Sequence, residues 1–91
     1  MRDILIRAKE IIKRGWCKGK YEKTIGLKRH YCMIGAISKA SEYESGMYKN
    51  VIRYVEEFTP NNSNLAFFND AASRRKEQVI RVFDKAIKGL G

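Results

Sequence analysis

The most versatile chemistry in this sequence belongs to Cys17, Cys32 and the only histidine, His30. Sulfur and imidazole ligands bind zinc, but a structural zinc site uses four ligands, usually in closely spaced pairs. These three are separated by twelve residues and by one, and a fourth ligand would have to be a carboxylate. We therefore expect no metal site and no cofactor, and we interpret both cysteines as small buried hydrophobic residues with free thiols.

A cysteine nucleophile is the alternative use of the same residues. Cys32 stands where a helix is expected to begin, and the free amides and dipole of a helix start lower the pKa of a thiol. His30 lies two positions earlier, on the same side of an extended chain, and Asn69 or Asp70 could orient its ring. A catalytic group of Cys32, His30 and Asp70 would make the protein a small cysteine-dependent enzyme.

We nevertheless favour a protein that has no catalytic residue and is not an enzyme. No cysteine-protease signature surrounds Cys17 or Cys32, and a chain of 91 residues leaves little room for a substrate cleft. Asn69 and Asp70 also have a structural interpretation, because both residue types cap helices and a helix is expected to follow them. Trp16 comes after the first expected helix, where we predict that its large ring fills the small core.

The main functional signal is a net charge of +9, from 19 Lys and Arg against 10 Asp and Glu. Such an excess of positive charge attracts polyanions, because binding releases their counterions. The alternative is that the charge only keeps the protein soluble. Tyr21 and Tyr31 stand among the cations and could stack on bases, while solvated lysines beside core aromatic residues are the structural alternative. The candidate nucleic-acid-binding residues are Lys18, Lys20, Lys23, Lys28, Arg29, Arg74, Arg75 and Lys76.

The elements that position these residues are predicted to be mainly helical. Apolar residues recur at helical spacing over four stretches, residues 3–14, about 31–42, 45–58 and about 73–89. Asp3 is the expected cap of the first helix and Gly15 its end, and Arg74, Arg75 and Lys76 would open the last helix, where cations oppose the dipole. The glycine-rich residues 16–30 are expected to form a loop or a short hairpin that turns near Gly26.

A loop is predicted between the third and last helices, because Pro60 disfavours helix before it and the following asparagines bond to their own backbone. Leu65, Phe67 and Phe68 are expected to be buried and to fix this loop to the core, and Leu90 is expected to face inward. We thus predict one mainly α domain over residues 1–91, with about four helices and a glycine-rich loop or short β-hairpin after the first. A mixed fold is the alternative.

Several short motifs resemble an uncharacterised family of small bacterial and bacteriophage proteins. They are GWC at 15–17, CMIGA at 32–36 and FND at 68–70, followed by the closing helix VIRVFDKAI. Members of that family often have tryptophan where this chain has Phe68, and residues 39–64 match no motif. The resemblance implies no activity and no binding residue. It does imply that one set of positions belongs together: Trp16, Cys17, Cys32, Gly35, Ala36, Asn69 and Asp70.

These observations predict a small basic binding protein that acts on nucleic acid or a nucleoprotein, and on a host component if the chain is a bacteriophage product. A protein interaction or inhibitor module without nucleic-acid contact is the second hypothesis, and the cysteine-dependent enzyme is the third. The sequence contains no apolar run near the length of a membrane span and no secretion signal, so a cytoplasmic location without membrane contact is expected. We expect a monomer or a homodimer.

Overall fold

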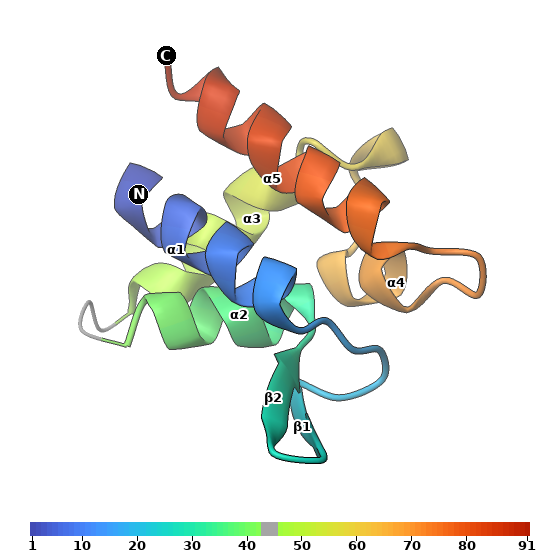
Figure 1. Ribbon diagram of the computed structural model, residues 1–91. Helices are drawn as coiled ribbons and strands as arrows, with labels where there is room; N and C mark the ends of the chain where they lie inside the picture. The colour runs from blue at the N-terminus through green and yellow to red at the C-terminus, as the bar shows by residue number, and fades with distance from the viewer. Residues whose placement is uncertain (43–45) are drawn as a thin grey trace.

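The computed structural model describes residues 1–42 and 46–91, which form five α-helices and one antiparallel hairpin (Figure 1). The elements in chain order are α1 (Arg2–Arg14), β1 (Glu22–Ile25), β2 (Lys28–Tyr31), α2 (Met33–Ala40), α3 (Met47–Glu56), α4 (Leu65–Asp70) and α5 (Lys76–Gly89). The predicted mainly α fold is confirmed, and of the two forms predicted after the first helix the structure has the hairpin. The described residues hold five α-helices where about four were predicted. Within the described residues, no helix combines the length and the apolar character that crossing a bilayer requires.

Helix α1 lies against both α2 and α5 (Figure 1). Its apolar residues recur every three or four positions, so a single face supplies its fully buried side chains, which are Ile4, Leu5, Ala8 and Ile12. Lys13 and Arg14 occupy the last turn, where cations face the negative end of the helix dipole, and Gly15 ends the helix as predicted. Asp3 is not the cap, because α1 begins at Arg2 and no side chain bonds its first amides.

The core is a continuous apolar cluster to which all five helices contribute. It holds Met33, Ala36 and Ile37 from α2, together with a second set from the later helices, Val51, Val55, Leu65, Phe68, Val79, Val82, Phe83 and Ala86. The predicted inward stripes are therefore largely confirmed. Leu90 is an exception, because it follows α5 and remains 40% exposed.

The hairpin extends outside the helical layers and is attached to them at its open end (Figure 1). Glu22 pairs with Tyr31 and Ile25 with Lys28, which leaves a two-residue turn whose first member, Gly26, has φ 64°, a value glycine adopts without steric cost. The chain around Trp16 runs parallel to the end of β2, since the Tyr31 amide donates to Gly15 O at 3.0 Å.

Gly35 makes the other attachment of the hairpin possible. The carbonyl oxygen of Tyr21 accepts a bond from the Cys32 amide at 3.2 Å and lies over the first turn of α2. A Cβ at Gly35 would stand only 1.9 Å from that oxygen, so no larger residue fits without moving the backbone. The glycine therefore allows the hairpin to contact the helix directly.

The segment before α5 differs from the prediction. Pro60–Asn62 form a short 3₁₀ turn, and residues 65–70 form a helix rather than a loop, capped by the Asn64 side chain, which accepts from the Phe67 amide at 3.2 Å. Leu65 and Phe68 are buried as predicted, but Phe67 lies on the outer face and is 76% exposed. Helix α5 begins at Lys76 and not near Ser73, and the third predicted helix began at Ser45, which is outside the described residues.

Candidate functional site

Asn69 connects the positions that the family-like motifs singled out. Its side chain is fully buried, and its Oδ1 accepts from Trp16 Nε1 at 2.8 Å and from the Met33 amide at 3.0 Å. Its Nδ2 donates to Cys17 O at 3.1 Å and to Asp70 Oδ1 at 2.8 Å. Two accepted and two donated bonds are the full capacity of an amide side chain. The residue therefore joins the link after α1, the start of α2 and the end of α4.

This geometry corrects the prediction that Asn69 and Asp70 cap the last helix. Both residues end α4, and their bonds run toward Trp16 and the glycine-rich segment. The first turn of α5 is closed instead by Gln78, whose side chain accepts from the Arg75 amide at 2.9 Å. The sequence signal that was available is the FND triplet itself, in which a polar amide directly follows the buried Phe68.

Asp70 and Lys18 fasten the glycine-rich segment to the chain after α4. Asp70 Oδ1 accepts from the Gly19 amide at 3.0 Å, and Lys18 Nζ donates to the carbonyl oxygens of Ala71 at 2.7 Å and Ala72 at 3.2 Å. The same ammonium lies 5.5 Å from the centre of the Trp16 ring, within range of a cation–π attraction. Trp16 packs against the core as predicted, although it is only partly buried.

Both cysteines are free and buried, as predicted. Cys32 caps α2, with its Sγ accepting from the Gly35 amide at 3.4 Å, while the Cys17 thiol donates to Lys20 O at 3.6 Å. Burial raises the pKa of the Cys32 thiol above its ordinary value of 9.0, and outweighs the opposing effect of the Gly35 and Ile34 amides. Burial, and then the neighbouring Cys32, raise the pKa of Cys17 as well.

This outcome argues against the alternative in which the helix start favours a thiolate at Cys32. A raised pKa keeps the sulfur protonated at neutral pH, and the thiolate is the nucleophilic form. His30 makes its polar contact elsewhere, with Nδ1 3.2 Å from Lys28 O, and its ring lies beside Gly15. Over residues 1–42 and 46–91, no cluster of three or more His, Cys, Asp or Glu side chains could hold a metal ion.

Three of the eight candidate nucleic-acid-binding cations bond to backbone carbonyls. Besides Lys18, Arg74 Nε donates to Phe68 O at 2.7 Å with its guanidinium 3.7 Å from the Phe68 ring centre, and Lys76 Nζ donates to Lys13 O at 2.9 Å. The carbonyls that Arg74 and Lys76 contact belong to the last turns of α4 and α1, where positive charge is favourable. Two of the cations at the head of α5 thus stabilise the ends of other helices.

The other five candidates are exposed, and four of them lie on or next to the hairpin. These four are Lys20, Lys23, Lys28 and Arg29, while Arg75 stands apart at the start of α5. Arg29 is paired with Glu22 across the strands at 2.8 Å. Ile25 and Leu27 at the tip are also exposed, by 52% and 106%. The hairpin therefore presents cations and apolar side chains together.

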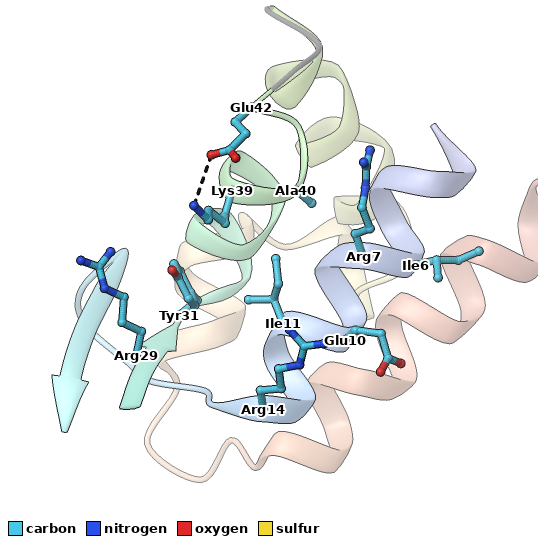
Figure 2. A pocket seen from close by; sticks show the side chains of 10 residues that line it. All are labelled: Ile6, Arg7, Glu10, Ile11, Arg14, Arg29, Tyr31, Lys39, Ala40 and Glu42. Atoms are coloured by element: carbon cyan, nitrogen blue, oxygen red, sulfur yellow. Dashed lines mark hydrogen bonds and ion pairs between the residues drawn. The ribbon is translucent and has the colours of Figure 1, made fainter. Parts of the chain in front are cut away.

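A groove of about 560 Å³ lies between α1, β2 and α2 (Figure 2). Its apolar wall is made of Ile6, Ile11, Tyr31 and Ala40. In the part of the chain that the structure describes, its charged residues are Arg7, Glu10, Arg14, Arg29, Lys39 and Glu42, and Lys39 is bonded to Glu42 at 3.3 Å. Tyr31 and Arg29 were candidates from the sequence.

The sequence interpretation missed the residues that α1 contributes to this groove. Arg7, Ile11 and Arg14 recur at intervals of four and three, so they share one face of the helix. That spacing was readable as a basic stripe beside the apolar one. What the sequence did not show is that β2 and α2 complete the groove opposite this face.

Comparison with known proteins finds no match among curated proteins or solved structures. One family model does match, over residues 1–89. This span includes Trp16, the Cys32 cap, the close contact at Gly35 and the buried Asn69 that joins them. The chain belongs to DUF6197, a family of unknown function.

Proposed function

We propose that this protein is a non-enzymatic binding protein whose basic hairpin contacts nucleic acid, either free or within a nucleoprotein. The observation that carries the proposal is the location of Lys23, Lys28 and Arg29 on one projecting hairpin, with Lys20 just before it (Figure 1). A host component is the proposed target if the chain is a bacteriophage product.

Charge and shape support this function. A phosphate backbone binds clustered lysines and arginines by releasing its counterions, and the chain carries a net charge of +9. A two-stranded ribbon fits a nucleic-acid groove, and exposed apolar side chains at its tip resemble the wedges with which some proteins separate base steps. Ile25 and Leu27 occupy that position. A binding role also agrees with the raised pKa of both thiols, which leaves them poor nucleophiles.

The test compares two variants that lose the same charge. The hairpin variant carries Lys20→Gln, Lys23→Gln, Lys28→Gln and Arg29→Gln. The control variant carries Lys49→Gln, Arg53→Gln, Lys85→Gln and Lys88→Gln, which are exposed residues of α3 and α5 with the same three lysines and one arginine. Fluorescence anisotropy with labelled mixed-sequence oligonucleotides, at salt from about 20 to 200 mM, reports the affinity and its salt dependence.

We expect the wild-type protein to bind and its affinity to fall steeply as salt rises. The hairpin variant should lower the slope of log affinity against log salt by about three to four units, because each phosphate contact contributes about 0.9. The control variant should change this slope much less. Equal losses in both variants would mean that only overall charge matters, and absence of binding at low salt would reject the function in favour of a protein interaction module.

A further inference from the structure

We propose that the groove between α1, β2 and α2 holds one unpaired nucleotide of a single-stranded nucleic acid, with its base against Tyr31 and its two flanking phosphates at Arg29 and Arg14, which lie on either side of that ring (Figure 2). This inference rests on the proposed function and specifies its substrate class. It predicts a preference for single strands, or for duplexes with an extruded base, over intact duplex.

The size of the groove fits a ligand no larger than a small molecule, such as a single nucleotide. At about 560 Å³ it falls in the range of pockets that hold small molecules, and it has a partly apolar wall with charged residues around it. The bases of a duplex are stacked on each other, so their faces reach a protein pocket only after leaving the stack. A nucleotide of a single strand can enter the groove without the free-energy cost of unpairing a base from a duplex.

The strand geometry provides a surface for the base. Side chains alternate along a strand, so Arg29 and Tyr31 of β2 share the face that lines the groove (Figure 2). Tyr31 is partly buried and packed against the core, and its backbone is fixed by the bond to Gly15 O. An aromatic ring held in this way is suited to stack on a base, whichever base it is.

The phosphate positions follow from the two arginines that line the groove. The guanidinium groups of Arg29 on β2 and Arg14 on α1 lie on either side of the Tyr31 ring (Figure 2). Guanidinium groups bind phosphate oxygens through paired hydrogen bonds. The Arg29–Glu22 ion pair is exposed, and a phosphate can displace such a pair at little cost.

The groove is also continuous with the hairpin, because Arg29 belongs to both. The pairing register places Lys23 and Lys28 on the other face of the hairpin, so Arg29 is the hairpin cation that the groove shares. An acidic peptide is the other occupant that cations and apolar residues would accept. We favour the nucleotide because an aromatic residue with an arginine on either side lines a small site.

The test measures binding of a labelled oligothymidylate and of a duplex of equal length to the wild type and to two groove variants, Arg14→Glu and Tyr31→Leu. Their matched controls are Arg53→Glu, in the last turn of α3, and Tyr48→Leu, an exposed tyrosine of α3. Leucine retains bulk against the core, and thermal unfolding verifies that each variant folds. Polyglutamate serves as a competitor of the oligothymidylate.

We expect the single strand to bind more tightly than the duplex, and Tyr31→Leu to weaken single-strand binding by about tenfold, the effect of losing one stacked base. Arg14→Glu should act in the same direction, and both controls should bind like the wild type. Equal binding of duplex and single strand, with no effect of the groove variants, would overturn the inference while leaving the hairpin interface intact. If polyglutamate displaces the labelled oligothymidylate as effectively as unlabelled oligothymidylate does, the groove would instead be assigned to an acidic peptide.

Discussion

The cluster around Asn69 and the surface formed by the hairpin and groove use polar residues in opposite ways. In the cluster, the amide of Asn69 is fully buried and all of its hydrogen-bonding capacity is used within the protein. On the hairpin, which projects from the core, Lys23 and Lys28 are exposed, as is Lys20 just before it. The Asn69 amide thus has its full hydrogen-bonding capacity occupied within the protein, whereas the ammonium groups of these lysines are exposed to solvent.

The lysines and arginines also fall into two groups, according to whether the side chain is bonded within the protein or exposed to solvent. Lys18, Arg74 and Lys76 donate to backbone carbonyls and hold the chain together, while the hairpin cations face solvent. Net charge alone does not distinguish them. A cation near a helix end or a chain reversal lies close to backbone carbonyl oxygens that can accept its hydrogen bonds. A cation on a projecting strand has few such acceptors nearby.

The largest effect is expected from Asn69→Ala, which removes the centre of the buried cluster. The Trp16 indole and the Met33 amide would lose their acceptor, and each buried donor left unsatisfied costs about 1 to 3 kcal/mol. We expect the free energy of unfolding in urea to fall by about 3 kcal/mol or more. Asn50→Ala on the exposed face of α3 is the control and should cost almost nothing; a similar loss in both variants would contradict the role of the cluster.

Gly35→Ala should have the next largest effect, because it separates the hairpin from α2. The new Cβ would stand 1.9 Å from Tyr21 O, so the backbone must shift, at a cost of about 1 to 3 kcal/mol. Gly19→Ala provides the comparison, since no atom lies within 4 Å of its Cβ and only the positive φ of 79° is penalised. If Gly35→Ala leaves both the stability and the oligonucleotide affinity unchanged, the contact between the hairpin and α2 at Gly35 does not position the proposed nucleic-acid-binding surface.

A smaller effect is expected at alkaline pH. Burial raises the pKa of Cys17 and Cys32 above 9.0, so the unfolded chain releases these protons first. Their contribution to stability is complete below pH 9.0 and is lost as the pH rises through the folded-state values. A double Cys17→Ser and Cys32→Ser variant should show a shallower decline of unfolding free energy above pH 9 than the wild type. Parallel declines would show that the thiols are not effectively buried.

The smallest effect is expected from Glu22→Gln on the hairpin. The Arg29–Glu22 pair is exposed, so its loss should leave the melting temperature unchanged. Removing this acid should tighten nucleic-acid binding slightly, because Arg29 no longer has a competing carboxylate. Weaker binding in this variant would indicate that Glu22 orients Arg29 for its partner.

Much of the fold was predictable because helical spacing of apolar residues is a local signal. The periodic Ile and Leu residues located α1, and the turn at Gly26 located the hairpin. The helix α4 was missed because LAFFND is short, and its cap Asn64 lies in a run of turn-forming residues that suggested a loop.

The site was less predictable because its contacts join residues far apart in the chain. Asn69 bonds to Trp16 across 53 positions, and no local pattern distinguishes that role from a helix cap. Similarly, the groove depends on α1 and β2 meeting beside Gly15, which only the packed structure defines. The alternative of a thiolate at Cys32 had a related weakness, since its position before a helix does not show that burial outweighs the helix-start amides.

The most direct test of the interface is a titration of ¹⁵N-labelled protein with a short oligothymidylate, followed by amide chemical shifts. We predict that the changes concentrate in the hairpin and in the adjoining turn of α1, from Arg14 to Gly15 and from Lys20 to Tyr31. Amides around Asn69 should change little, because that cluster is buried and fully bonded. Shifts spread over α3 and α5, or no shifts at low salt, would contradict the account.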